Sequence, residues 1–238
     1  MKTVKHEDKD LKKEFQIERL VLFSDAVFAI AITLLIIEIK VPELNLAELR
    51  RNNPEFIQHP DRALLELLSS EMLAKFIGFV VSFVVIALYW INHHLLFGML
   101  HNYSRKLIWA NLRFLFTIVL MPFTSAFYSD YWMSGLITPI AFYSINILLS
   151  GLTILQLWRM ITNPANNLCV SPPPPALVSY YKARSLTAAI VFMVSFGIAY
   201  ISVNWAYGTP IIIPLVMWGI KAYYRKKAPQ IFTKGSDH

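Results

Sequence analysis

The chain has 238 residues, of which 56% are hydrophobic and only 16% are charged, and its mean hydropathy is +0.49. An ordinary soluble domain carries about 25% charged residues, so this composition excludes a soluble fold for most of the chain and favours a lipid bilayer as its solvent. The net charge of +7 does not indicate nucleic-acid binding, because Lys and Arg stand in the ends and loops between apolar segments, as topology signals do.

The first 19 residues form an arm of mixed charge, too polar and too acidic for a signal peptide. We expect the arm to be a short or frayed helix on the membrane surface. The first apolar segment runs from about Leu20 to Val41, and Pro42 is expected to stop it. A polar stretch follows, and its later part, DRALLELLSSEML, predicts a helix that leads directly into the second span.

Five further apolar segments predict membrane-spanning helices. They run from about Leu73 to Leu96, Leu107 to Tyr128, Gly135 to Trp158, Ala183 to Trp205 and Pro210 to Tyr224. The last has only 15 residues, whereas a span typically needs about 20, so four or five spans are an alternative. The run from Pro172 to Pro175 predicts extended backbone before the fifth span. We predict an all-α, polytopic membrane protein of six transmembrane helices.

The distribution of basic residues predicts the orientation. Sixteen of the 22 Lys and Arg stand in the arm, the second-to-third loop, the fourth-to-fifth loop and the tail. The third-to-fourth and fifth-to-sixth loops hold none. Loops rich in Lys and Arg stay in the cytoplasm. We therefore expect a multi-pass protein of the cell membrane with both termini cytoplasmic, which requires an even number of spans.

The first span carries polar groups that a bilayer rarely tolerates. An aspartate inside a membrane helix, here Asp25, needs a partner or water. Projected at 100° per residue, the aliphatic residues Ile30, Leu34 and Ile37 share one face, Thr33 lies at its edge, and Asp25 lies almost opposite. If this stripe faces a pore, Asp25 faces into the bundle. Such a stripe is also typical of plain helix packing or lipid contact.

The second span contains Trp90, His93 and His94, which share one helix face. Adjacent histidines in a membrane can suggest a metal site, but membrane metal enzymes use many more of them, and of the six histidines here His6, His59 and His238 lie in segments far from His93 and His94 and outside the spans. We expect no metal site and no cofactor. A hydrogen-bonded structural pair is the alternative interpretation.

The run R-x-x-x-F-S-D, from Arg19 to Asp25, opens the first span and is followed by A-x-x-A-I-A-I-T. This pattern resembles the endosomal/lysosomal potassium channel family (transmembrane protein 175) in its bacterial branch. The six-span layout, the Trp and His residues of the second span and Asn111 early in the third agree with it, over about residues 15 to 225. The resemblance implies a homotetramer in the bilayer. Each chain would have a cytoplasmic arm at 1–19, a six-helix channel domain at 20–228 and a cytoplasmic tail at 229–238.

The resemblance also implies a pore lined by the first helix. Its constriction would consist of Ile30, Leu34 and Ile37, with the Thr33 hydroxyl offered to a passing ion. There is no T-V-G-Y-G sequence, so a filter of backbone carbonyls is not available. The implied activity is a potassium-selective channel, with potassium ions in the pore. The resemblance is also compatible with weak selectivity for potassium and with the passage of protons.

A polar network would pin the pore helix to the bundle, as the same resemblance implies. Its members would be Arg19, Phe23, Ser24, Asp25, Trp90, His93, His94 and Asn111. Buried networks of this kind specify one geometry and fail when they are half satisfied. Glu38 would form an acidic ring at the outer mouth, or else an interfacial ion pair with Lys40.

Three other functions are compatible with parts of the pattern. A secondary transporter for a small cation would suit six spans with charges inside them, but we find no internal repeat and no Gly or Pro in the first span. A membrane enzyme would need a His, Asp and Glu ligand set that the sequence lacks. A purely structural subunit is excluded only by the motif.

Overall fold

The computed structural model describes residues 2–40, 48, 51, 57–132, 134–171 and 173–233. In these ranges the regular structure is helical, apart from an isolated bridge between Leu100 and Cys169. Six segments are long and apolar enough to cross a membrane, which confirms the predicted all-α fold with six spans. They are Leu11–Ile37, Lys75–Phe97, Arg105–Asp130, Thr138–Ile161, Pro175–Ala199 and Val203–Lys227.

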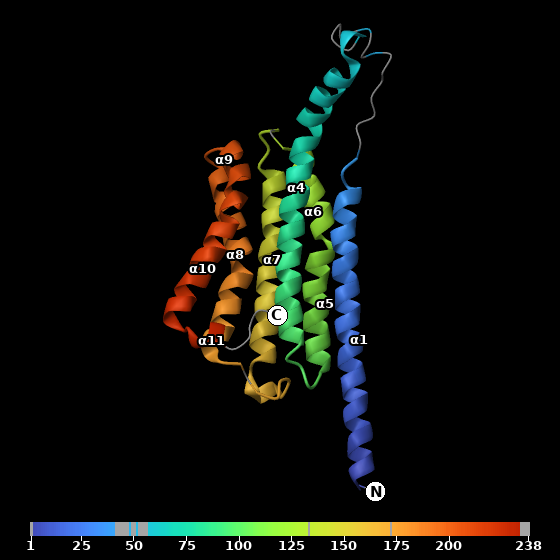
Figure 1. Ribbon diagram of the computed structural model, residues 1–238, viewed down its shortest axis with the longest axis vertical. Helices are drawn as coiled ribbons and strands as arrows, with labels where there is room; N and C mark the ends of the chain where they lie inside the picture. The colour runs from blue at the N-terminus through green and yellow to red at the C-terminus, as the bar shows by residue number, and fades with distance from the viewer. Residues whose placement is uncertain are drawn as a thin grey trace.

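The first helix, α1 (Lys2–Ile37), includes the whole charged arm. Figure 1 shows it as one straight rod that extends past the rest of the bundle at its N-terminal end. The arm is therefore not the separate surface helix that its charge predicted. No Pro or Gly stands between Lys2 and Ile37 to break the helix. The predicted stop at Pro42 lies outside the described residues.

The second long helix, α4 (Pro60–Phe97), joins the polar segment DRALLELLSSEML to the second span without a break. This confirms the predicted helical lead. Figure 1 shows the first turns of α4 projecting beyond the bundle at the end opposite to the N-terminus.

The third span consists of two helices where the sequence predicted one. Ser104 caps α5 (Arg105–Val119), since its hydroxyl accepts a hydrogen bond from the Leu107 amide at 3.1 Å. The helix is interrupted at Leu120, and α6 (Met121–Asp130) continues in the same direction (Figure 1). Pro122 accounts for the break, because its ring excludes a continuous ladder of backbone hydrogen bonds.

The fourth span lies within three residues of its predicted bounds, but the predicted bounds of the other two were wrong: the fifth begins eight residues and ends six residues earlier, and the sixth begins seven residues earlier. The fourth is α7 (Thr138–Ile161), and the 3₁₀ turn η1 (Pro164–Asn166) follows it. The fifth, α8 (Pro175–Ala199), begins on the last residue of the proline run, a position that proline suits. The sixth comprises α9 (Val203–Gly208), the 3₁₀ turn η2 (Thr209–Ile212) and α10 (Ile213–Lys227), and a short α11 (Gln230–Thr233) closes the described chain.

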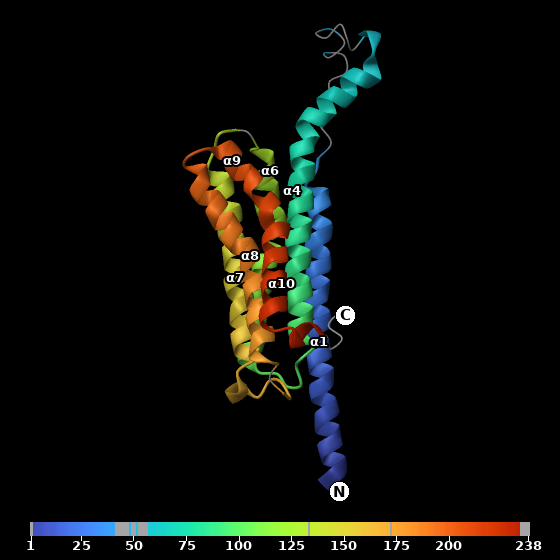
Figure 2. The same cartoon turned by 60° about the vertical axis from the view of Figure 1, so that its left-hand side comes forward.

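The helices form a bundle with α1 at one edge and α10 at the other (Figure 1), and in the turned view of Figure 2 α10 lies in front, between α8 and α4. The most extensive contact is between α7 and α8, and α5 and α6 pack on α7. At one edge α1 packs on α4, α5 and α6, and at the other α10 packs on α8. The two outer helices are thus the least covered within one copy of the chain.

The contact between α4 and α6 is unusually close. A methyl group built on Gly78 of α4 would lie 2.8 Å from the Cβ atom of Ser129 on α6. One turn further along α4, the Ser82 hydroxyl lies 2.6 Å from the hydroxyls of both Ser125 and Tyr143. Small residues let membrane helices approach and exchange hydrogen bonds, so Gly78 fixes the distance at which this cluster forms.

Replacing Gly78 by Ala is expected to lower the free energy of unfolding by about 1–3 kcal/mol, because the added methyl must push α4 away from α6. The same change at Gly197, in α8, places the methyl where nothing lies within 4 Å, so it should leave stability unchanged or raise it slightly. Thermal unfolding in detergent, followed by circular dichroism, compares the two variants. Equal melting temperatures would contradict the close approach of α4 to α6.

Candidate functional site

The inner face of α1 is buried against the bundle. Its buried residues are Ser24, Phe28, Ala31 and Leu35, at intervals of four, three and four positions. This spacing is one stripe of a helix, and it lies on the opposite side from Ile30. The stripe is apolar except for Ser24, so the serine marks where hydrogen bonds enter the contact.

Asn111 connects three helices through its side-chain amide. Its nitrogen donates to the Ser24 hydroxyl of α1 at 2.9 Å, and its oxygen lies 2.9 Å from His93 Nε2 of α4. The Ser24 hydroxyl in turn donates to the Leu20 carbonyl at 2.8 Å. Because the Asn111 nitrogen donates to Ser24, its oxygen is the acceptor, and His93 carries a proton on Nε2.

His93 is held between aromatic rings. The Phe97 ring stacks on the imidazole with a centroid separation of 3.9 Å, and the rings of Phe114 and Phe28 both lie at 5.6 Å. The side chain is fully buried. The imidazole is thus fixed both by packing and by its bond to Asn111, as expected of a structural histidine.

A second link joins α1 to α4 at the next residue along α1. Trp90 Nε1 donates to the Asp25 carboxylate at 2.9 Å. Asp25 is half-buried, and the Trp90 ring lies beside that of His94 at 5.4 Å. The carboxylate that the sequence placed away from the aliphatic stripe therefore has a hydrogen-bond donor on the neighbouring helix.

The structure leaves three of the expected network members outside these bonds. Among the described residues Arg19 forms no hydrogen bond or ion pair, and its guanidinium lies 5.9 Å from the centre of the Phe15 ring. Arg19 and Asp25 are six positions apart, which places them on different sides of a helix. His94 and Phe23 are exposed.

The opposite face of α1 is uncovered within one copy. Ile30 is 59% exposed, Leu34 38% and Ile37 67%. The exposed Thr33 hydroxyl donates back to the carbonyls of Ala29 and Ile30, at 3.0 and 2.9 Å. Its oxygen therefore keeps lone pairs that can face a cation.

Glu38 and Lys40 stand near the end of α1 and are both exposed. The alternative expectation of an ion pair between them is not seen, since neither side chain forms one among the described residues. Throughout the residues that the structure describes, no group of three or more His, Cys, Asp or Glu side chains could hold a metal ion.

Sequence reasoning missed the aromatic residues around His93. Phe28, Phe97 and Phe114 come from three different helices, α1, α4 and α5. Of the three, only Phe28 could have been predicted to lie near this network, because it follows Ser24 by four positions and so shares its face of α1. The other two rings depend on how α4 and α5 are rotated.

A model of the family described as "Endosomal/lysosomal potassium channel TMEM175" matches residues 19–122. The matched range contains the whole of the α1, α4 and α5 contact described above. Over this range the chain is similar to the TMEM175 family. This is a family of ion channels and not of enzymes.

Two bacterial proteins named as potassium channels are similar in sequence. One, from Chryseobacterium sp. (strain P1-3), is 32% identical over 140 residues, which cover 58% of this chain and 62% of that protein. The chain thus matches less than two thirds of that relative's length. The other, from Streptomyces collinus, is 28% identical over 186 residues, covering 77% of this chain and 82% of that protein.

The fold is similar to a solved structure, described as a lysosomal potassium-selective channel TMEM175 homolog from Chamaesiphon minutus. The TM-score is 0.63 at 22% sequence identity, over 88% of this chain and 98% of that one. At this identity the likeness establishes a TMEM175 fold and leaves the activity to be argued from the residues.

Replacing Trp90 by Phe is expected to lower the free energy of unfolding by about 1–3 kcal/mol, because the half-buried Asp25 carboxylate loses its donor while the ring packing stays. Thermal unfolding by circular dichroism measures the effect. Trp109→Phe is the matched control, since Trp109 is exposed and forms no hydrogen bond with the described residues. Equal melting temperatures for the two variants would show that the bond between Trp90 and Asp25 contributes nothing.

Proposed function

We propose that this chain is a potassium channel that works as a homotetramer, with the four α1 helices around a central pore. The observation that carries the proposal is the two-sided character of α1. Its hydrogen-bonded face, with Ser24 and Asp25, is turned to the bundle, and its branched aliphatic face, with Ile30, is turned away. Similarity to a potassium-channel family and the names of the two bacterial relatives support the choice of ion.

The thin coverage of α1 supports assembly of several copies. Only 22% of its most apolar stretch is buried within one copy, against 39–56% for the next four spans. The network residues nevertheless fix the rotation of α1 about its own axis. An outer helix held so firmly in one orientation, with a regular aliphatic row on its free side, suits a symmetric contact around an axis better than a mobile contact with lipid.

The conducting path in this proposal is a hydrophobic constriction. Rings of Ile30, Leu34 and Ile37 from four copies hold back water, so an ion must shed part of its hydration shell to pass. Potassium holds its water less tightly than sodium does, which favours potassium to a modest degree. Thr33 oxygens replace some of the lost water. Protons pass through the same intermittently wetted path.

The orientation in the membrane belongs to the same proposal. An even number of spans puts the start of α1 and the end of α10 on one side, and both stand at the same end of the bundle in Figure 1. Sixteen of the 22 Lys and Arg lie in the segments on that side, which makes it the cytoplasmic side of the cell membrane. Glu38 then stands at the outer mouth, where four copies attract cations.

A flux assay in liposomes tests the proposal. The purified chain is reconstituted with potassium inside and sodium outside, a protonophore is added, and a pH-sensitive dye reports the proton influx that compensates potassium efflux. We expect rapid quenching, a smaller signal from an opposite sodium gradient, and none from empty liposomes. With valinomycin in place of the protonophore, the dye reports the proton permeability of the channel itself.

Native mass spectrometry of the same preparation gives the number of copies, and we expect four. A chain that is monomeric throughout, or liposomes whose flux equals that of empty ones, would overturn the proposal. A monomer that exchanges cations with saturable kinetics would instead indicate a secondary transporter.

A further inference from the structure

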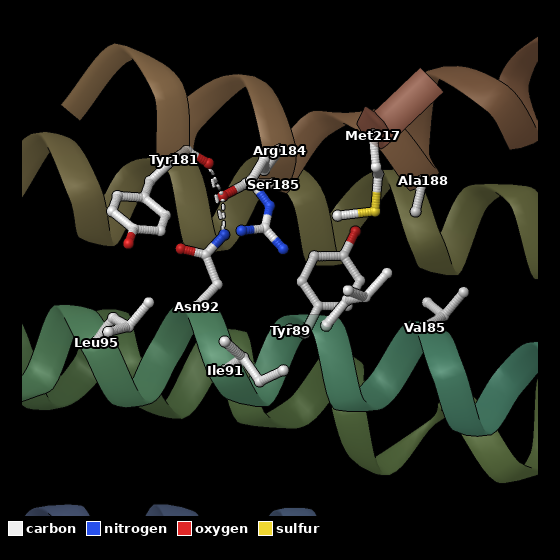
Figure 3. Close-up of a pocket in the computed structure, with 11 residues that line it drawn as sticks. Val85, Tyr89, Ile91, Asn92, Leu95, Tyr181, Arg184, Ser185, Ala188 and Met217 are labelled. Carbon is white, nitrogen blue, oxygen red and sulfur yellow. Dashed lines mark hydrogen bonds between the residues drawn. The ribbon is translucent and has the colours of Figure 1, made fainter. Parts of the chain in front are cut away.

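A narrow cleft runs between α4, α8 and α10, on the side of the bundle away from α1. The cleft itself encloses only about 20 Å³, and the rest of the roughly 410 Å³ of empty space along it is open to the surroundings of the bundle. Figure 3 shows its lining, which is mostly apolar. Aliphatic and thioether side chains enter it from all three helices: Val85, Leu88 and Leu95 from α4, Ala188 from α8 and Met217 from α10.

Arg184 of α8 brings a positive charge into this apolar cleft. In Figure 3 its guanidinium points toward α4, between Asn92 and Tyr89. It donates one hydrogen bond, to the Tyr180 hydroxyl at 3.3 Å, and lies 5.5 Å from the centre of that ring. A guanidinium has five N–H donors, so most of its donor capacity is unused by the described residues.

The polar side chains of Asn92, Tyr89 and Ser185 in the cleft have their partners. Asn92 accepts a hydrogen bond from the Trp158 indole at 2.9 Å and donates to the Ser185 hydroxyl and the Tyr181 carbonyl. The Tyr89 hydroxyl donates to the Ile147 carbonyl at 3.1 Å. Arg184 is therefore the polar group that the cleft leaves for a ligand.

No carboxylate of the described residues neutralises this arginine. From residue 131 to the end, the sequence has eight Lys and Arg but a single acidic residue, Asp237, which lies outside the described residues. Among the described residues Arg184 forms no ion pair. A cation inside a span needs a partner, and the charge balance of α7, α8 and α10 points to an anion from outside the chain.

The cleft has the polarity profile of one leaflet. Tyr180, Tyr181 and Tyr224 gather near the start of α8 and the end of α10, with the centre of the Tyr180 ring 5.2 Å from that of Tyr181 and 5.5 Å from that of Tyr224. Tyrosines favour the level of the lipid headgroups. Arg184 lies one helical turn deeper than Tyr180, and Ala188 one turn deeper again. The charge thus lies at headgroup level, and the apolar part of the cleft extends toward the membrane centre.

We propose that this cleft binds one anionic phospholipid of the surrounding leaflet, with its phosphate on Arg184 and one acyl chain beside Ala188 and Met217. The guanidinium offers paired donors that match phosphate oxygens. A zwitterionic lipid is disfavoured, because no acidic side chain here receives its ammonium group and the basic residues repel it. The bound chain fills the gap between α4 and α10, and so braces an outer helix that has little other contact.

The test is lipid titration of the full chain in mild detergent, read by native mass spectrometry. The probes are palmitoyl-oleoyl-phosphatidylglycerol, which is anionic, and palmitoyl-oleoyl-phosphatidylcholine, which is zwitterionic. We expect one tightly bound phosphatidylglycerol per chain and weaker binding of phosphatidylcholine. Arg184→Gln should weaken phosphatidylglycerol binding by about tenfold or more, the scale of a charged hydrogen bond. Arg113→Gln, an exposed arginine outside the cleft, should leave it unchanged.

Met217→Trp separates this proposal from a simple attraction of anions, since it keeps the charge and fills the apolar end of the cleft. It should also weaken phosphatidylglycerol binding, and it decides the question if Arg184→Gln does not fold. Full binding in Met217→Trp would overturn the proposal. So would equal affinity for the two lipids, an equal loss in Arg113→Gln, or displacement of phosphatidylglycerol by oleate at equal concentration.

Discussion

Channels that carry Ile30→Asn are expected to lose most of their preference for potassium over sodium. In one copy the Ile30 side chain is 59% exposed on the face of α1 that is turned away from the bundle. Four amides in place of four branched side chains let water and hydrated ions through, so the cost of dehydration no longer separates the two ions. A change of about 1 kcal/mol in that cost alters the permeability ratio about fivefold. Liposome flux under matched potassium and sodium gradients measures the ratio.

Ile36→Asn is the control for this experiment. Ile36 is also an exposed isoleucine of α1, but it lies about 120° around the helix from Ile30, off the proposed pore face. The change should leave the ratio as it is in the unaltered chain. If Ile30→Asn and Ile36→Asn shift selectivity equally, or if neither does, the pore is not lined by the face that contains Ile30.

The sequence predicted the two faces of α1 but not the partners of the inner one. Periodicity alone separates Ile30 from Asp25, because both belong to one regular helix. Trp90, His93 and His94 share one face of α4, so spacing cannot say which of them meets Asp25. That depends on the rotation of α4 against α1. In the structure Trp90 bonds Asp25, His93 bonds Asn111, and His94 is exposed.

Composition alone did not predict where several of the helices begin and end. The sixth span looked short because Gly208, Thr209 and Pro210 suggest a loop, whereas a 3₁₀ turn carries the helix through them. The charged arm was predicted as a short or frayed helix because its charges favour contact with water. Contact with water does not determine where a helix ends, and the arm is part of α1. The cleft around Arg184 was not predictable, since it depends on the packing of three helices that are distant in sequence.

The adjacent histidines of α4 provide the sharpest test of the network. His93→Ala is expected to lower the free energy of unfolding by about 2–5 kcal/mol, because it opens a cavity beside Phe97 and leaves the Asn111 oxygen without its donor. His94→Ala should cost about 0.5 kcal/mol or less, since that side chain is exposed and, among the described residues, its ring contacts no ring but that of Trp90. Thermal unfolding in detergent and the oligomeric state after purification are the measurements.

His93→Phe divides the effect into its two causes. A phenyl ring keeps the stacking on Phe97, which is at 3.9 Å in the structure, but it cannot donate to Asn111. Its loss of stability should therefore lie between those of His93→Ala and His94→Ala. If His93→Phe is as stable as the unaltered chain, packing alone holds α1 to α4 and α5, and the hydrogen bonds through Asn111 are dispensable. If the two alanine variants are equally stable, His93 is not the residue on which this contact depends.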